Sequence, residues 1–110
     1  MSKIFYDHLI VIEEVIAVLG RHNLNKRERA EFLSLIDQTL HHQILDEILT
    51  LLPKSRHAEF LSMFHKRPDD PLLLTFLREH SGVSIDKAIM KRADKTKKDL
   101  IEIINKSQAE

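Results

Sequence analysis

The sequence predicts an all-α fold, a small bundle of about five helices, three longer and two short, forming a single domain over residues 1–110. Apolar residues recur every three or four positions in five stretches, the period of a helix that buries one face. The breaks between these stretches are short, and each holds residues that start or end helices: Gly20, Asn25, Pro53, Asp70-Pro71 and Gly82-Val83-Ser84.

The first stretch predicts a helix over about residues 3–19 that Gly20 ends in a left-handed conformation. Its β-branched run also fits a strand, but no second strand-like segment is there to pair with it. Ile10, Val11 and Val18 widen the apolar face beyond a one-sided stripe. Either this helix is the central element of the bundle, or these three residues form an excess apolar face for a protein partner or a second copy of the chain.

The second stretch predicts the longest helix, over residues 25–52. Asn25 can cap the free amides at its start, Glu28 completes a capping box, and Pro53 forbids extension. Its buried face is predicted to hold Phe32, Leu33, Ile36, Leu40, Ile44, Ile48 and Leu52.

Three further helices follow. One covers about residues 55–66, with Ser55 as its cap. The next is capped by Asp70, has Pro71 at its first position and ends at Gly82. The last begins at Ser84 and runs through Ile104.

Several of these features occur together: Leu52-Pro53 at the end of a long helix, Glu59-Phe60-Leu61, Asp69-Asp70, Phe76-Leu77 and a charged terminal helix. In this combination the chain from residue 25 onward resembles an uncharacterised family of short all-helical bacterial proteins, a domain of unknown function. The resemblance implies a fold class and carries no activity or site residues.

Composition narrows the functional classes. The formal net charge is zero, so the whole molecule exerts no long-range attraction on nucleic acid or on an anionic membrane. No cysteine is present, which fits a reducing compartment, and we expect a cytoplasmic protein. The apolar run Leu9 to Leu19 is interrupted by Glu13 and Glu14 and is too short to span a bilayer, so we expect neither a signal peptide nor a membrane segment.

No pattern predicts catalysis or a cofactor. The serines lack a nucleophile elbow, and two glycines leave no phosphate-binding loop, so we expect a protein that is not an enzyme. Asp37 and His41, and likewise His42 and Asp46, are spaced i,i+4 and can meet on a helix face. Because the adjacent histidines point about 100° apart, they predict surface hydrogen bonds rather than a metal site.

The terminal helix carries a basic ridge of Lys87, Lys91, Lys95 and Lys98. Such a ridge can follow the phosphates of a nucleic acid, but interspersed aspartates dilute its charge and no aromatic residue is interleaved for base stacking. The alternative is an ordinary solvated face.

These observations favour an interaction module that associates with a protein partner or with itself through Ile10, Val11 and Val18. The alternative function is a nucleic-acid-binding accessory protein that uses the four lysines.

Overall fold

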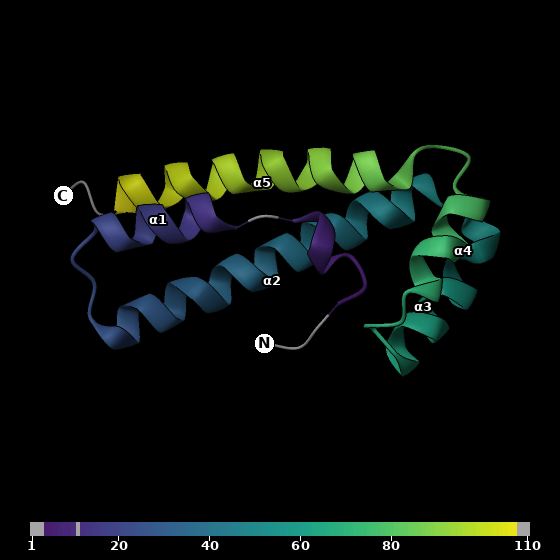
Figure 1. Cartoon of the computed structure of the whole chain (residues 1–110), viewed down its shortest axis with the longest axis horizontal. Coiled ribbons are helices and arrows are strands. Elements are labelled where there is room, and N and C mark those ends of the chain that lie inside the picture. The colour runs from purple at the N-terminus through teal and green to yellow at the C-terminus, as the bar shows by residue number, and fades with distance from the viewer. Residues whose placement is uncertain (1–3, 11, 108–110) are drawn as a thin grey trace.

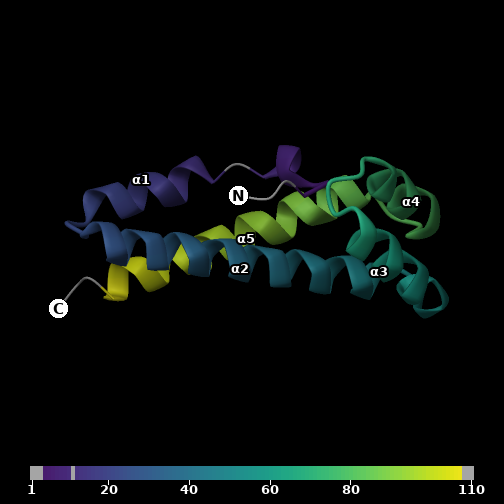
Figure 2. The ribbon, with the colours of Figure 1, turned by 90° about the horizontal axis from the view of Figure 1, so that it is seen from below.

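Two long antiparallel helices lie side by side and run the length of the molecule (Figures 1 and 2). The computed structural model describes residues 4–10 and 12–107. This part of the chain has no strand and extends over 47 × 24 × 20 Å. Its elements are the 3-10 turns η1 (Asp7–Leu9) and η2 (Lys54–Arg56) and the helices α1 (Glu13–Arg21), α2 (Lys26–Leu51), α3 (His57–Lys66), α4 (Leu72–His80) and α5 (Ile85–Ser107).

The predicted all-α class is confirmed, but the first helix is shorter than predicted. Residues 3–19 were expected to form one helix. Instead η1 is followed by extended backbone at Ile10 (φ −119°, ψ 124°), and α1 begins only at Glu13. The Phe5 amide donates to the Pro68 carbonyl oxygen at 2.8 Å, and this long-range contact holds Phe5 against the loop before α4 and competes with a continuous helix.

Gly20 does not end α1. The helix continues to Arg21, and among the described residues only Gly82 has a positive φ. His22 is extended after the last turn, and its Nε2 lies 3.0 Å from the Asn105 side-chain oxygen on α5. The chain therefore leaves α1 at the point where His22 contacts α5.

The ends of α2 and α4 follow the sequence signals closely. The Glu28 amide donates to the Asn25 side chain at 2.8 Å, and the Asn25 amide donates to the Glu28 carboxylate at 3.1 Å, so the predicted capping box is confirmed. The Asp70 side chain accepts the Leu72 amide at 3.0 Å, and Gly82 takes φ +71° after α4.

The start of α3 differs from its prediction. Ser55 lies inside η2 and not at the cap of α3. The helix begins at His57, and its preceding residue, Arg56, makes no capping bond through its side chain.

The core lies mainly between α2 and α5. The buried residues of α2 recur every four positions, and those of α5 form a matching stripe: Ile36, Leu40, Ile44 and Ile48 from α2, and Ile85, Ile89, Ala93, Leu100 and Ile104 from α5. Arg92 of α5 crosses to α2, where its Nη1 donates to Glu47 at 2.8 Å and its Nε to Gln43 at 3.0 Å. These directional bonds set the register of the two helices.

The short helices α3 and α4 pack together at one end of the long pair (Figure 1). Phe60 of α3 is fully buried, and its ring centroid lies 6.2 Å from that of Phe5 and 6.5 Å from that of Phe76. Arg78 of α4 holds the Asp86 carboxylate of α5 at 2.6 Å, and this hydrogen bond lowers the pKa of Asp86. The contact between Phe5 and Phe60 anchors the N-terminal segment to the end of the bundle formed by α3 and α4.

We expect Ile44→Ala to lower the free energy of unfolding by about 2–5 kcal/mol, because Ile44 is fully buried and its truncation leaves a cavity. Leu35→Ala is the matched control on the same helix: Leu35 is 48% exposed, and its loss should change stability by less than about 0.5 kcal/mol. Urea denaturation followed by circular dichroism measures both. Equal losses would show that α2 turns another face to the core.

Candidate functional site

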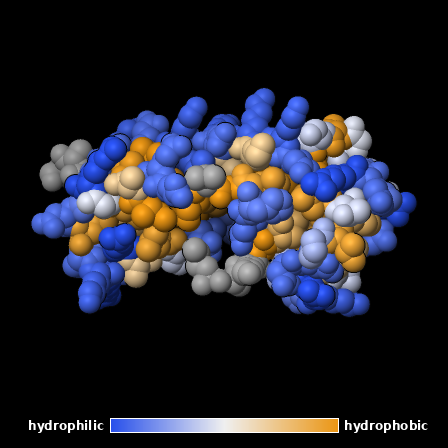
Figure 3. All heavy atoms as spheres, in the orientation of Figure 1, coloured by the Kyte–Doolittle hydropathy of each residue, from blue (hydrophilic) through white to orange (hydrophobic). Residues whose placement is uncertain are grey.

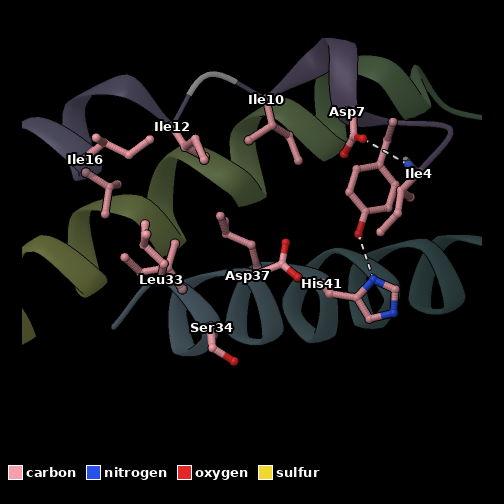
Figure 4. A pocket seen from close by; sticks show the side chains of 13 residues that line it. Ile4, Asp7, Ile10, Ile12, Ile16, Leu33, Ser34, Asp37 and His41 are labelled. Carbon is pink, nitrogen blue, oxygen red and sulfur yellow. Dashed lines mark hydrogen bonds between the residues drawn. The ribbon is translucent and has the colours of Figure 1, made fainter. Parts of the chain in front are cut away.

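An apolar groove of about 600 Å³ runs between the N-terminal part of the chain and the middle of α2 (Figure 4). Ile12 and Ile16 face Leu33 near one end, and Ile10 lies across from Asp37 nearer the middle. The described residues that line it are mostly aliphatic: Ile4, Tyr6, Asp7, Ile10, Ile12, Val15 and Ile16 on one wall, and Leu33, Ser34, Ile36, Asp37, Leu40 and His41 on the other.

The groove exists because α1 packs mainly against α5 rather than against α2. On α2 the lining residues recur at the spacing of a single helix face over nine positions, from Leu33 to His41. On the opposite wall the extended backbone at Ile10 continues the row of isoleucines beyond the start of α1. Two elements thus supply facing apolar walls without closing over each other.

A hydrogen bond bridges the two walls at one end of the groove. The Tyr6 hydroxyl oxygen lies 3.0 Å from Nδ1 of His41, and the His41 ring also stacks on Phe64 with centroids 5.7 Å apart. Burial, followed by the charges of Asp7 and Asp37, raises the pKa of Tyr6 well above its usual range. Burial and then neighbouring His42 lower the pKa of His41, so near neutral pH the phenol keeps its proton and the ring is uncharged.

The bridging bond changes the interpretation of the histidines. His41 was predicted to meet Asp37 in a surface hydrogen bond, but its described partner is Tyr6, 35 positions away in sequence. No group of three metal-ligating side chains is assembled among residues 4–10 and 12–107.

Two of the three residues predicted to form the protein-binding face, Ile10 and Val18, lie in different segments of the structure. Ile10 lines the groove, and Val11 lies outside the described residues. Val18 is only 7% exposed and belongs to the core, so it is not part of an excess apolar face. The break between η1 and α1 is the physical reason, because Ile10 and Val18 no longer share one helix.

The basic ridge lies on the exposed side of α5. Lys87, Lys91, Lys95 and Lys98 are all exposed, and none of them forms an ion pair with another described residue. Neighbouring charges are engaged differently: Lys97 is buried and contacts Asp94 at 3.2 Å, and Arg92 binds α2. On the face seen in Figure 3, hydrophilic side chains project along the edge where α5 lies, and hydrophobic residues gather beside them.

The sequence predicts that Leu33, Ile36 and Leu40 are buried on α2, which is confirmed for Ile36 and Leu40, but it does not predict that all three also line a groove. Leu33 is the residue from which the groove could have been predicted. It is apolar but falls outside the four-residue spacing of the buried positions on α2, so it widens the apolar face of the helix. It is 36% exposed in the structure.

No protein-family model, curated protein or solved structure matches this chain. The resemblance to the bacterial helical family stays a prediction. Within the described residues, none of the helices combines the length and apolar character needed to cross a bilayer.

We expect His41 to titrate below the ordinary histidine value of about 6.5, because burial disfavours its cation. A pKa lowered by folding means that the stability linked to His41 is complete above about pH 6.5 and decreases as the pH falls from there towards the folded pKa. Histidine titration by NMR, with thermal melts over the same range, tests this.

His42→Gln should raise the pKa of His41 by removing a neighbouring positive charge. Exposed His65 is not among the groups that shift the pKa of His41, so His65→Gln is the control. A His41 pKa at or above 6.5 in the unmodified chain would contradict the expected burial effect.

Proposed function

We propose that this chain is a non-catalytic interaction module of the cytoplasm that binds an apolar helical segment of a protein partner. The observation that carries the proposal is the open groove between residues 4–10 and 12–16 on one side and α2 on the other, with aliphatic side chains on both walls. Apolar grooves of this kind receive one face of an amphipathic helix through side chains spaced i, i+3 or i+4, and i+7.

The dimensions fit a short helical segment. The α2 wall extends from Leu33 to His41, about 12 Å or slightly more than two turns at 1.5 Å per residue. A volume of about 600 Å³ is several times the roughly 150 Å³ of a cavity that holds one benzene molecule. The groove therefore has room for two or three apolar side chains, each contributing about 1.5–3 kcal/mol on burial, which fits a reversible complex once the cost of association is subtracted.

The first test uses a helix-forming peptide of roughly 18 residues, long enough to populate a helix, with leucines at i, i+4 and i+7. We expect Leu33→Glu to weaken its binding at least about tenfold, because an apolar contact is lost and a carboxylate must be desolvated, a change of about 1.4 kcal/mol or more. Calorimetric titration of the peptide measures the change.

Leu35→Glu is the matched control, since Leu35 is exposed on the same helix but does not line the groove. Its peptide affinity should equal that of the unmodified chain, and NMR shifts on binding should fall on residues 10–16 and 33–41. Equal loss in both variants, or shifts confined to other helices, would contradict binding in the groove.

The second candidate function is nucleic-acid binding through the basic ridge, favoured by four exposed lysines without ion-pair partners in the described part of the chain. If the chain binds RNA or DNA, the triple variant Lys91→Glu, Lys95→Glu, Lys98→Glu should no longer bind at physiological salt, because it loses the positive charges that would contact phosphates. Its fold should remain intact, because exposed charges contribute little to stability. Fluorescence anisotropy with labelled oligonucleotides measures this.

A variant with the same charge change elsewhere, Lys26→Glu, Lys54→Glu and Lys66→Glu, separates the ridge from a general loss of positive charge. Similar loss in both triple variants would argue against a site on α5. An unmodified chain that binds no oligonucleotide would rule out this second function.

A further inference from the structure

The groove carries two acidic side chains in an otherwise largely apolar lining. Asp7 comes from the N-terminal wall and Asp37 from α2, and neither forms an ion pair with another described residue. The only other titrating side chains in the described lining are His41 and Tyr6, which are uncharged near neutral pH. The groove therefore has a net negative charge when it is empty.

The negative charge lies between the middle of the groove and its Tyr6–His41 end (Figure 4). Asp37 lies near the middle of the groove, and Asp7, which follows Tyr6 in the chain, lies towards the end that the Tyr6–His41 bond closes. The other end, where Ile12 and Ile16 face Leu33, is aliphatic (Figure 4). Leu33 and Asp37 are one helical turn apart on α2, so the apolar and acidic parts follow each other along the groove.

We propose, building on the function inferred above, that the groove selects a cationic amphipathic helix from a partner protein, with apolar side chains against Ile12, Ile16 and Leu33 and a lysine or arginine one to two turns away, at Asp7 and Asp37. The negative charge of the groove favours a positively charged helix over a neutral or negative one. A second copy docking by its own groove would face these carboxylates with the same carboxylates, because a twofold contact uses one patch twice. An acyl chain with an anionic head would meet the same repulsion.

The test compares three versions of the leucine peptide that differ only at the position predicted to meet Asp37: lysine, glutamine or glutamate. We expect the unmodified chain to bind them in that order, with lysine favoured over glutamine by about three- to fivefold, the range of a solvent-exposed ion pair. The preference should shrink between about 50 mM and 300 mM salt because exposed charges are screened.

Asp37→Asn is the diagnostic variant. Asp37 is exposed and has no hydrogen-bond partner among the described residues, so the variant should melt like the unmodified chain. It should bind the glutamine peptide with unchanged affinity and lose most of the preference for lysine. Glu31→Gln removes the same charge from α2 outside the groove lining and should keep the full preference. Asp7→Asn tests the second carboxylate, and its amide oxygen can still accept the Ile4 backbone N–H. This variant should lose another part of the preference for the lysine peptide.

The outcomes separate this inference from the function on which it rests. Three peptides that bind alike, all blocked by Leu33→Glu, would overturn the charge selection and leave groove binding in place. A lysine preference that survives in the Asp7→Asn, Asp37→Asn double variant would also overturn it. Absence of binding by all three peptides would overturn both. A chain that dimerises on light scattering, and no longer does so as Leu33→Glu, would replace the cationic partner with a second copy.

Discussion

The helix α5 packs against α2 along the bundle and also contacts α1, η1 and α4. One helix thus supplies the surface on which four elements are placed. Because apolar burial is not directional, the position of α5 along α2 depends on polar contacts, which Arg92 provides by reaching Gln43 and Glu47. The pairing of α2 with α5 in turn limits where η2, α3 and α4, which connect the two helices, can lie.

The groove is a consequence of unequal helix lengths. At 1.5 Å per residue, the nine residues of α1 span about 14 Å, whereas the 26 residues of α2 span about 39 Å. Since α1 packs on α5, it does not also cover the side of this α2 face on which Leu33 stays 36% exposed, whereas Ile36 and Leu40 on the same face are buried. The segment before α1, with η1 and the extended Ile10, continues that wall only partly, and it is held at its other end by Phe5 against Phe60 and Phe64. Tyr6 and His41 close one end and leave the aliphatic part accessible.

Local signals were sufficient for most of the fold. The box at Asn25 and Glu28, the stop at Pro53 and the left-handed Gly82 depend on a few neighbouring residues, and the structure has them where the sequence predicts them. The break near Ile10 was not predictable in this way, because the helical period continues through it and the competing contact, Phe5 with Pro68, joins positions far apart in the chain. The groove depends on the same kind of information: Tyr6 meets His41 only after the long helices are paired.

Asp37 connects the exposure of the groove to its selectivity. In the free chain this carboxylate is exposed and hydrated, so keeping a charge at the edge of an apolar surface costs little. An apolar helix that covers the groove removes that hydration, and the loss is compensated only where the helix brings a positive charge or a hydrogen-bond donor to the same place. The cost of dehydrating Asp37 therefore weakens complexes with helices that bring no such group, and it does not lower the stability of the unbound chain. Aliphatic walls supply attraction that many apolar helices would share, and an acidic end discriminates among them.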